Sequence, residues 1–168
     1  MKQKINLLYS WFVWLVTFFL PDISFTMRFR GWMYSLAMAE SGKNFQVSSG
    51  ARLYGLNKIS VGDDVYIATN VVINAGEEVV LGSEVMIGIG AIIVSGNHSL
   101  LNGSYRFGSL KREPILVHRG SWISANVVLV SGSEIPKSSL IAANSVVTKK
   151  LKVSGVYAGA PAELKSRD

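Results

Sequence analysis

Apolar positions recur every six residues along the second half of the chain. The branched apolar residues that mark this period are Val117, Ile123, Leu129, Ile135, Ile141 and Val147. An α-helix repeats every 3.6 residues and a strand every 2, so a strict period of six fits neither as one long element. It fits a chain that turns a corner every six residues and buries one branched side chain per side. Such a period is typical of a hexapeptide parallel β-helix.

The same period continues towards the N-terminus. Its earlier anchors are Val47 and Leu53 in a ragged first coil, then Val61, Ile67 and Ile73, then Leu81, Ile87 and Ile93. Residues that tolerate a positive φ stand at the corners between anchors: Gly62, Asp64, Gly82, Gly88, Gly90, Asn126, Gly132 and Asn144. A β-sandwich, the other all-β alternative, would show alternation with irregular spacing. We therefore predict an all-β chain with a β-helix over residues 41–155 and a C-terminal tail over residues 156–168.

Three insertions interrupt the period. Eight residues separate Leu53 from Val61 and Ile73 from Leu81, and twenty-four separate Ile93 from Val117. If three sides make one coil, all three insertions fall at the same corner. The largest is predicted to be a loop over about residues 96–114 that projects from the coil. Insertions in a solenoid map to one side, which is often the binding side.

The N-terminal region, residues 1–40, differs in character from the repeats. Residues 5–20 are almost continuously apolar and follow Lys2 and Lys4, but sixteen residues are short of the roughly 20 that span a bilayer. Residues 25–39 mix aromatic side chains and methionines with two arginines. We predict a helical extension and keep three interpretations open: helices at a membrane interface, helices that cover the coil end or a subunit contact, and one spanning helix.

The charge of the chain limits the classes of partner that it is expected to bind. The net charge is +6, from 17 basic and 11 acidic residues, and basic residues concentrate in residues 105–120 and 149–168. Such clusters attract phosphorylated ligands or anionic surfaces, although basic coil ends are also often plain solvated surface. They lack an interleaved aromatic platform, so no nucleic-acid partner is expected. The chain has no cysteine, which excludes disulfides and thiolate metal sites.

Of the two histidines, His98 is the candidate for chemistry. It lies at the base of the predicted loop, five residues after the anchor Ile93, and Glu78 holds the corresponding place one coil earlier. Adjacent coils are about 4.8 Å apart, so a carboxylate one rung away would orient the imidazole and raise its basicity. The alternative is a loop histidine without a role. His118 is predicted to be a surface residue, and two histidines cannot form a three-histidine zinc site, so no metal is expected.

Three stretches of the sequence resemble hexapeptide-repeat acetyltransferases that use acetyl-CoA. They are VMIGIGA (residues 85–91) leading into GNH (96–98), GSWISANV (120–127), and AANSVVTK (142–149) followed by VYAGAPA (156–162). The resemblance covers about residues 42–165. Within that family, the apolar N-terminus resembles enzymes that O-acetylate bacterial surface polysaccharides such as O-antigen or capsule.

The resemblance implies a left-handed coil, a homotrimer, and active sites between neighbouring subunits. It also implies that His98 is the general base for a sugar hydroxyl, with Glu78 as a candidate partner. One family branch has Asn and Asp thirty and twenty-two residues before this histidine, where this chain has Ala68 and Gly76. The sugar contacts therefore do not carry over, and the candidates for substrate binding are Asn70, Asn74, Asn97 and Trp122.

The resemblance places the acetyl-CoA co-substrate in two zones. Exposed coil backbone would meet the pantetheine arm at four small residues: Ser124, Ala125, Ala142 and Ala143. The nucleotide phosphates would lie near a second group, which is Thr148, Lys149, Lys165 and Arg167. Lysine serves there as a point charge.

The first functional hypothesis is an O-acetyltransferase that acts on a glycan or glycan precursor in surface polysaccharide synthesis. It would work in the cytoplasm, with peripheral contact to the inner face of the membrane through residues 1–40. The alternatives are a xenobiotic or amino-sugar acetyltransferase of the same fold, and a non-catalytic β-helix scaffold. The scaffold hypothesis predicts that His98→Ala leaves any cellular phenotype intact.

Overall fold

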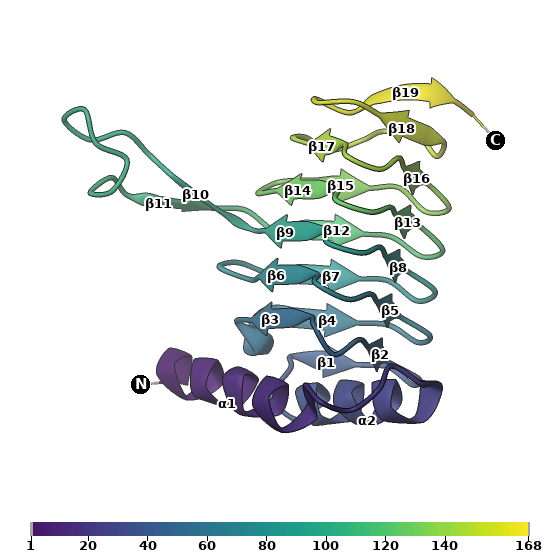
Figure 1. Ribbon diagram of the computed structural model, residues 1–168. Helices are drawn as coiled ribbons and strands as arrows, with labels where there is room; N and C mark the ends of the chain where they lie inside the picture. The colour runs from purple at the N-terminus through teal and green to yellow at the C-terminus, as the bar shows by residue number, and fades with distance from the viewer. Residues whose placement is uncertain (1, 168) are drawn as a thin grey trace.

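The protein is a stack of three-sided coils with a helical layer at one end (Figure 1). The computed structural model describes the backbone of residues 2–167 and the side chains of residues 4–167. Successive sides of each coil join three separate parallel sheets, here called sheets A, B and C. The predicted parallel β-helix is confirmed.

Each sheet runs the length of the stack. Sheet A contains, in spatial order, β1 (Glu40–Ser41), β4 (Ile59–Val61), β7 (Val79–Leu81), β12 (Ile115–Val117) and β15 (Glu134–Ile135). Sheet B contains β2 (Gln46–Val47), β5 (Tyr66–Ile67), β8 (Met86–Ile87), β13 (Trp122–Ile123), β16 (Leu140–Ile141), β18 (Val156–Ala158) and β19 (Glu163–Ser166). Sheet C contains β3 (Arg52–Tyr54), β6 (Val72–Asn74), β9 (Ile92–Val94), β14 (Val128–Val130) and β17 (Val146–Val147). Residues 156–166, predicted as a tail, thus extend sheet B, where β19 returns antiparallel to β18.

The six-residue anchors form the core because the parallel register stacks each on its counterpart in the next coil. In sheet B, Ile67 pairs with Ile87, Ile87 with Ile123, and Ile123 with Ile141. All four are fully buried. Branched side chains are stiff and pack well against a pleated surface, which explains their regular use at these positions.

Two features of the backbone make the coils tight: positive φ angles at the corners and close contact between adjacent coils. Several corner residues adopt the left-handed region, among them Asp64, Asn126 and Asn144 with φ of 58°, 56° and 61°. Adjacent coils also approach closely: a Cβ on Gly88 would lie 2.7 Å from the carbonyl carbon of Ser124. The corner between sheets B and C therefore has little room for larger side chains at this level.

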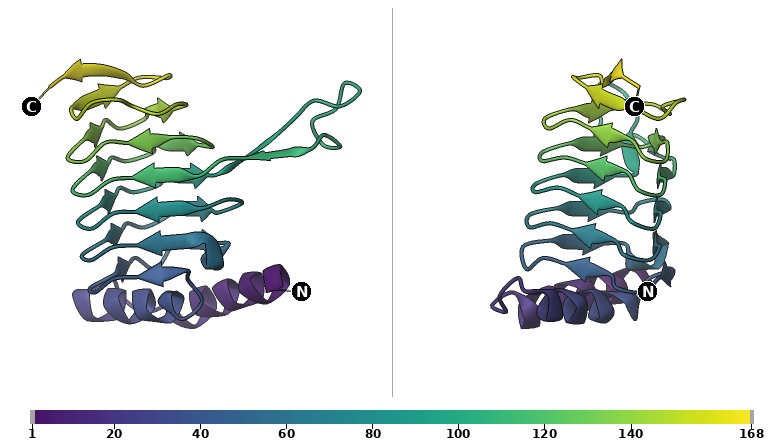
Figure 2. Two further views of the ribbon diagram at one scale, coloured as in Figure 1. Left: turned by 180° about the vertical axis from the view of Figure 1, so that it is seen from behind. Right: turned by 90° about the vertical axis from the view of Figure 1, so that its right-hand side faces the viewer.

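All three insertions lie at the corner between sheets C and A, as the spacing predicted. The first contains the short helix η1 (Leu56–Lys58), and the second is the turn between β6 and β7. The third is an antiparallel hairpin, in which β10 (Gly96–His98) pairs with β11 (Leu110–Arg112). Figure 2 shows that the hairpin projects well beyond the coil stack.

The helices α1 (Lys2–Thr17) and α2 (Ser24–Ser35) lie beneath the first coil and close that end of the core (Figures 1 and 2). Val13 of α1 and Tyr34 of α2 are buried in the same hydrophobic cluster as the coil anchors. Among residues 2–167, neither helix is long and apolar enough to cross a bilayer.

A buried arginine ties the two helices to the coil. Arg30 is fully buried and donates hydrogen bonds to the carbonyl oxygens of Thr17 (3.0 Å), Leu20 (3.2 Å) and Val47. It also pairs with Asp22 at 3.1 Å. Burial lowers the pKa of Arg30 and the Asp22 carboxylate opposes this effect. The guanidinium thus satisfies the polar groups where α1, α2 and the first coil meet.

Candidate active site

The corner that carries the insertions contains a groove of about 710 Å³. Its walls come from successive coils, from the hairpin and from the start of α1; they include Leu7, Tyr54, Asn74, His98, Leu110 and Arg112. The groove combines apolar surface with several hydrogen-bonding side chains. Such a mixture is typical of a small-molecule binding site.

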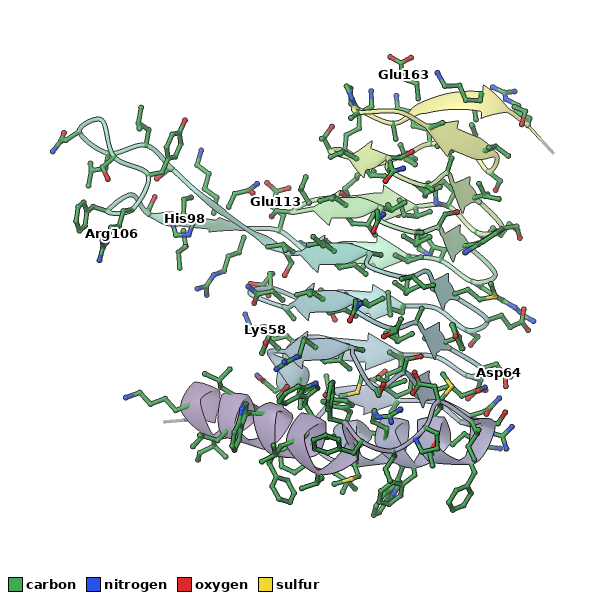
Figure 3. All side chains as sticks on the ribbon, viewed as in Figure 1. Lys58, Asp64, His98, Arg106, Glu113 and Glu163 are labelled. Carbon is green, nitrogen blue, oxygen red and sulfur yellow. The ribbon has the colours of Figure 1, made fainter. Side chains whose placement is uncertain are left out.

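His98 is the last residue of β10 and stands opposite Leu110 across the hairpin. Its side chain is exposed and lines the groove. Figure 3 shows it on the hairpin, away from the three sheets. Among residues 2–167 its imidazole has no hydrogen-bond partner, so both ring nitrogens remain open to a ligand. A neutral imidazole in this position can accept a proton.

The base of the hairpin is held rigidly. Ser95, the residue before β10, is fully buried; its hydroxyl donates to the carbonyl oxygen of Glu77 (2.7 Å) and accepts from the Glu77 amide (2.8 Å). One turn below, Lys58 donates to the carbonyl oxygen of Gly76 (2.7 Å) and forms an ion pair with Glu77 (3.4 Å). These bonds connect the three insertions, so the position from which His98 projects is determined by the coils beneath it.

Glu78 does not bond to His98 in the described part of the chain, where its side chain has no hydrogen bond. Its backbone oxygen instead accepts from the Ile115 amide (2.9 Å), where β7 and β12 begin. The six-residue registry suggested a partnership, but the hairpin carries His98 three residues beyond Ser95 and away from the corner. The nearby charged residue that the sequence analysis missed is Arg112. It faces Gly96 across the hairpin and lines the groove, and its place at the end of the long insertion was the available signal.

The four predicted substrate-binding residues are not gathered in one place. Asn74, at the end of β6, lines the groove, and Asn97 precedes His98 on β10. Asn70 lies at the opposite end of β6, in the corner between sheets B and C, with φ of 58°. Trp122 points outward from sheet B and lines a second pocket of about 280 Å³.

Four of the predicted cofactor residues stack at the corner between sheets B and C. Ser124 and Ala125 lie on one coil, and Ala142 and Ala143 on the next; the Asn144 amide bonds to the Ala125 carbonyl oxygen at 3.0 Å. The amides of Ala125 and Ala143 donate to no group that the structure describes. Two unused N–H donors beside small side chains suit a ligand that carries amide carbonyl groups.

The other four predicted cofactor residues lie elsewhere. Thr148 and Lys149 follow β17, at the corner between sheets C and A. Lys165 belongs to β19 and Arg167 follows it, at the end of the coil stack remote from the helices (Figure 1). The eight residues thus form a stacked group and two separate pairs, Thr148 with Lys149 and Lys165 with Arg167.

The corner between sheets B and C that holds Ser124, Ala125, Ala142 and Ala143 is here called the stacked corner. The hairpin and the stacked corner lie at opposite ends of the strands of sheet C. At about 3.3 Å per residue, the five or six residues of that side separate the two corners by about 15–20 Å. The hairpin extends away from the stack on the side opposite sheet B (Figure 1). Within one chain, therefore, His98 and the free amides of Ala125 and Ala143 cannot contact the same acyl group.

His118 has a structural partner. Its Nε2 lies 3.0 Å from Glu134 Oε1, and Lys150 Nζ lies 3.2 Å from Glu134 Oε2. These hydrogen bonds lower the pKa of Glu134, that from His118 being the larger cause. Because the cluster belongs to the adjacent coils of sheet A and lies outside the groove, the structure agrees with a surface role for His118.

The Glu134 cluster predicts a small pH dependence of stability. Since the pKa of Glu134 is lowered from its ordinary value of 4.5, the carboxylate stabilises the fold above that pH and loses this contribution as the pH falls below it. Glu134→Gln should therefore lower the free energy of unfolding at neutral pH by at most about 1 kcal/mol, because the pair is exposed. Urea unfolding measured on both sides of pH 4.5 checks this. Glu40→Gln is the control, since Glu40 forms no ion pair within residues 2–167; an equal loss in both variants would contradict the prediction.

Parallel three-sided coils with one extruded hairpin define the class of hexapeptide-repeat β-helix proteins. No family model matches the chain. In sequence the chain is 30% identical over 131 residues to galactoside O-acetyltransferase of Escherichia coli K12. That match covers 76% of this chain, and the chain spans just over half (55%) of that relative's length.

Solved structures share the fold over almost the whole chain. A hexapeptide-repeat acetyltransferase of Vibrio cholerae, solved with acetyl-CoA, superimposes with a TM-score of 0.83 at 24% identity, covering 95% of this chain and 85% of that chain. A galactoside acetyltransferase in complex with CoA gives 0.84 at 22% identity, covering 98% and 81%. A maltose O-acetyltransferase of Clostridium difficile gives 0.82 at 18% identity, covering 98% and 87%. These likenesses confirm the predicted left-handed β-helix fold.

The described residues contain no group of three or more histidine, cysteine, aspartate and glutamate side chains that could hold a metal ion. Both comparisons show that the chain is similar to acetyltransferases, in sequence and in fold. Some of these acetyltransferases were crystallised with CoA or acetyl-CoA.

Proposed function

We propose that this protein is an acetyl-CoA-dependent O-acetyltransferase of the hexapeptide-repeat family, acting on a glycan or glycan precursor in bacterial surface polysaccharide synthesis. The main observation behind the proposal is that His98 lines a groove at the corner between sheets C and A, where the insertions lie. Within residues 2–167 its imidazole has no hydrogen-bond partner. The sequence similarity to galactoside O-acetyltransferase supports the reaction class.

His98 acts as the general base in this proposal. It takes the proton from an acceptor hydroxyl, the oxygen attacks the thioester carbonyl carbon, and the C–S bond breaks. The proton on the imidazole then passes to the departing thiolate, so that the products are an acetyl ester and free CoA. Backbone N–H groups are suitable donors to the oxygen that gains charge in the transition state.

The stacked corner is the proposed pantetheine site. The free amides of Ala125 and Ala143 would donate to carbonyl groups of the pantetheine arm, and the small side chains of Ser124 and Ala142 let a ligand approach the backbone. Lys149, Thr148, Lys165 and Arg167 remain candidates for the phosphates. When bound, acetyl-CoA supplies the activated acetyl group.

The two parts of the site come from different subunits in this proposal. A cyclic homotrimer brings the hairpin of one subunit to the stacked corner of its neighbour, which resolves the separation of about 15–20 Å within one chain. The groove residues Tyr54, Asn74 and Arg112 would bind the acceptor, because an aromatic face and hydrogen-bonding groups suit a sugar ring.

A transfer assay tests the proposal. Purified protein is incubated with acetyl-CoA and a panel of galactosides, maltose, nucleotide sugars and lipid-linked saccharides, and thiol release is followed. Release that depends on a sugar acceptor supports the function and identifies the acceptor class. Release only with an antibiotic or an amino sugar would favour the alternative acceptor class, and absence of CoA binding would leave a scaffold as the better explanation.

A substitution at the stacked corner should separate cofactor binding from folding. Ala143→Asp places bulk and negative charge beside the free amides, so the KM for acetyl-CoA is expected to rise at least about tenfold, which corresponds to roughly 1.4 kcal/mol. Thr69→Asp is the matched control, because Thr69 occupies the same corner on a lower coil. Isothermal titration with CoA and steady-state kinetics check the result; equal effects of the two variants would contradict this placement of the cofactor.

A further inference from the structure

The helix α1 exposes an apolar side, while its coil-facing side is mixed and includes Val13 in the hydrophobic core. Its coil-facing side includes the polar residues Ser10 and Thr17, both buried; Ser10 donates to the carbonyl oxygen of Leu53 and Thr17 to that of Val13. The exposed residues from residue 5 of α1 to residue 19, just after the helix, are all apolar: Ile5, Leu7, Leu8, Trp11, Phe12, Leu15, Val16, Phe18 and Phe19. A helix on a water-facing surface normally exposes polar residues instead.

The helix α2 repeats this arrangement. Of its two arginines, Arg30 points inward and is fully buried and Arg28 is exposed, and an outward apolar stripe runs through Phe25, Phe29, Trp32 and Leu36. The spacing of four, three and four residues places these side chains on one face. Phe19 and Phe25, which flank the turn between the helices, are 85% and 76% exposed.

The two apolar faces belong to one layer at the end of the stack. Figures 1 and 2 show both helices beneath the first coil, and Figure 3 shows ring-bearing side chains that project from the layer away from the coils. The charge around this layer is positive. The acidic residue Asp22 is paired with buried Arg30, while Lys4 and Arg28 are exposed.

We propose that the α1–α2 layer is a docking face for an anionic bilayer surface, and that the acceptor of His98 is a saccharide anchored in that same bilayer. The acceptor part of this inference rests on the proposed acetyltransferase function. Exposed Trp, Phe and Leu beside cationic side chains are the composition of helices that lie in a membrane interface. The exposed Lys4 and Arg28 add attraction to anionic lipid headgroups.

The position of the groove relative to this face fits an anchored acceptor. Leu7 of α1 lines the groove directly, so the groove opens beside the layer. His98 leaves the stack from β9, which lies two coils above β3 in sheet C. Two coil spacings add about 10 Å and the helical layer another 10–12 Å, so His98 stands roughly 20 Å above the outer face of the helices. A lipid headgroup with a short glycan spans such a height.

Proposed threefold assembly strengthens this docking. A threefold axis along the coils would point the three helical layers in the same direction. Three modest interfacial contacts would then act together on one surface. This arrangement favours a flat bilayer over a protein partner for the exposed apolar face.

Vesicle co-sedimentation tests the docking face. The full chain is expected to bind anionic phosphatidylglycerol vesicles and to bind neutral phosphatidylcholine vesicles more weakly. Phe19→Ser combined with Phe25→Ser should weaken binding about tenfold or more. The matched control is Tyr105→Ser with Phe107→Ser, which removes two aromatic side chains that are 63% and 71% exposed on the hairpin tip; the control should bind as the wild type does.

An activity measurement separates failure of the inference from failure of the proposed function. With a lipid-linked acceptor in vesicles, the Phe19/Phe25 variant should lose about tenfold in kcat/KM, whereas its rate with a soluble sugar acceptor should not change. Transfer by the wild type without vesicle binding would overturn the docking inference and leave the acetyltransferase intact. Equal vesicle binding by the Phe19/Phe25 variant and the Tyr105/Phe107 control would also overturn it. So would a protein that binds no vesicles but self-associates in analytical ultracentrifugation, if the Phe19/Phe25 change abolishes that self-association.

Discussion

Replacing His98 with alanine is expected to slow acetyl transfer by roughly 10²–10⁴-fold and to leave CoA binding intact. The imidazole lines the groove and is the proposed base for a sugar hydroxyl, and within residues 2–167 it has no hydrogen bond whose loss would disturb the fold. Steady-state kinetics with a sugar acceptor and isothermal titration with CoA provide the two readouts.

His118→Gln is the matched control for the His98 experiment. It removes the only other histidine, whose bond to Glu134 lies outside the groove, so the transfer rate should stay within about twofold of the wild type. If the two variants lose activity equally, the loss reflects general damage. If His98→Ala retains full activity with CoA bound, His98 is not the base and the proposed mechanism is wrong.

Replacing Arg30 with alanine is expected to lower the free energy of unfolding by about 3–5 kcal/mol. The change removes a fully buried guanidinium, so the carbonyl oxygens of Thr17, Leu20 and Val47 lose their donor and Asp22 loses its ion-pair partner. Urea unfolding followed by circular dichroism measures the loss.

Arg28→Ala is the control for Arg30, because it removes the same side chain from an exposed position two residues earlier. It should change the free energy of unfolding by less than about 0.5 kcal/mol. If Arg30→Ala does not fold, Arg30→Lys keeps the charge but not the planar fork and should show a smaller loss. A loss for Arg30→Ala no larger than that for Arg28→Ala would show that the buried network does not stabilise the junction.

The coil could be predicted from the sequence because its structure is local and repetitive. Each six-residue unit needs one branched anchor such as Ile123 and one corner residue such as Asn126, and both requirements recur in register. The same counting located the three insertions, since an extra residue at any corner breaks the period. The role of residues 156–166 was missed because β18 and β19 follow a stretch in which the period has ended.

The candidate site was less predictable because it depends on contacts between distant residues. The sequence singled out His98 by its place in the longest insertion, but spacing alone assigned Glu78 as its partner. The geometry of the hairpin carries His98 away from that carboxylate and brings Arg112 into the groove instead. The pairing of β10 with β11 has no signature in the six-residue period, because the hairpin lies outside the repeats.

The sequence by itself therefore determined the class of fold, the corner at which the three insertions lie and the residue types available for chemistry. These follow from local periodicity and composition. Only the tertiary structure decided which of these residues meet. It separated His98 from the stacked corner of Ala125 and Ala143, and it placed Ser10 and Thr17 of α1 inward while nine apolar side chains of residues 5–19 stayed exposed. The physical reason is that two separate sets of buried hydrogen bonds, those of Arg30 beneath the first coil and those of Ser95 at the base of the hairpin, have partners that are distant in the sequence.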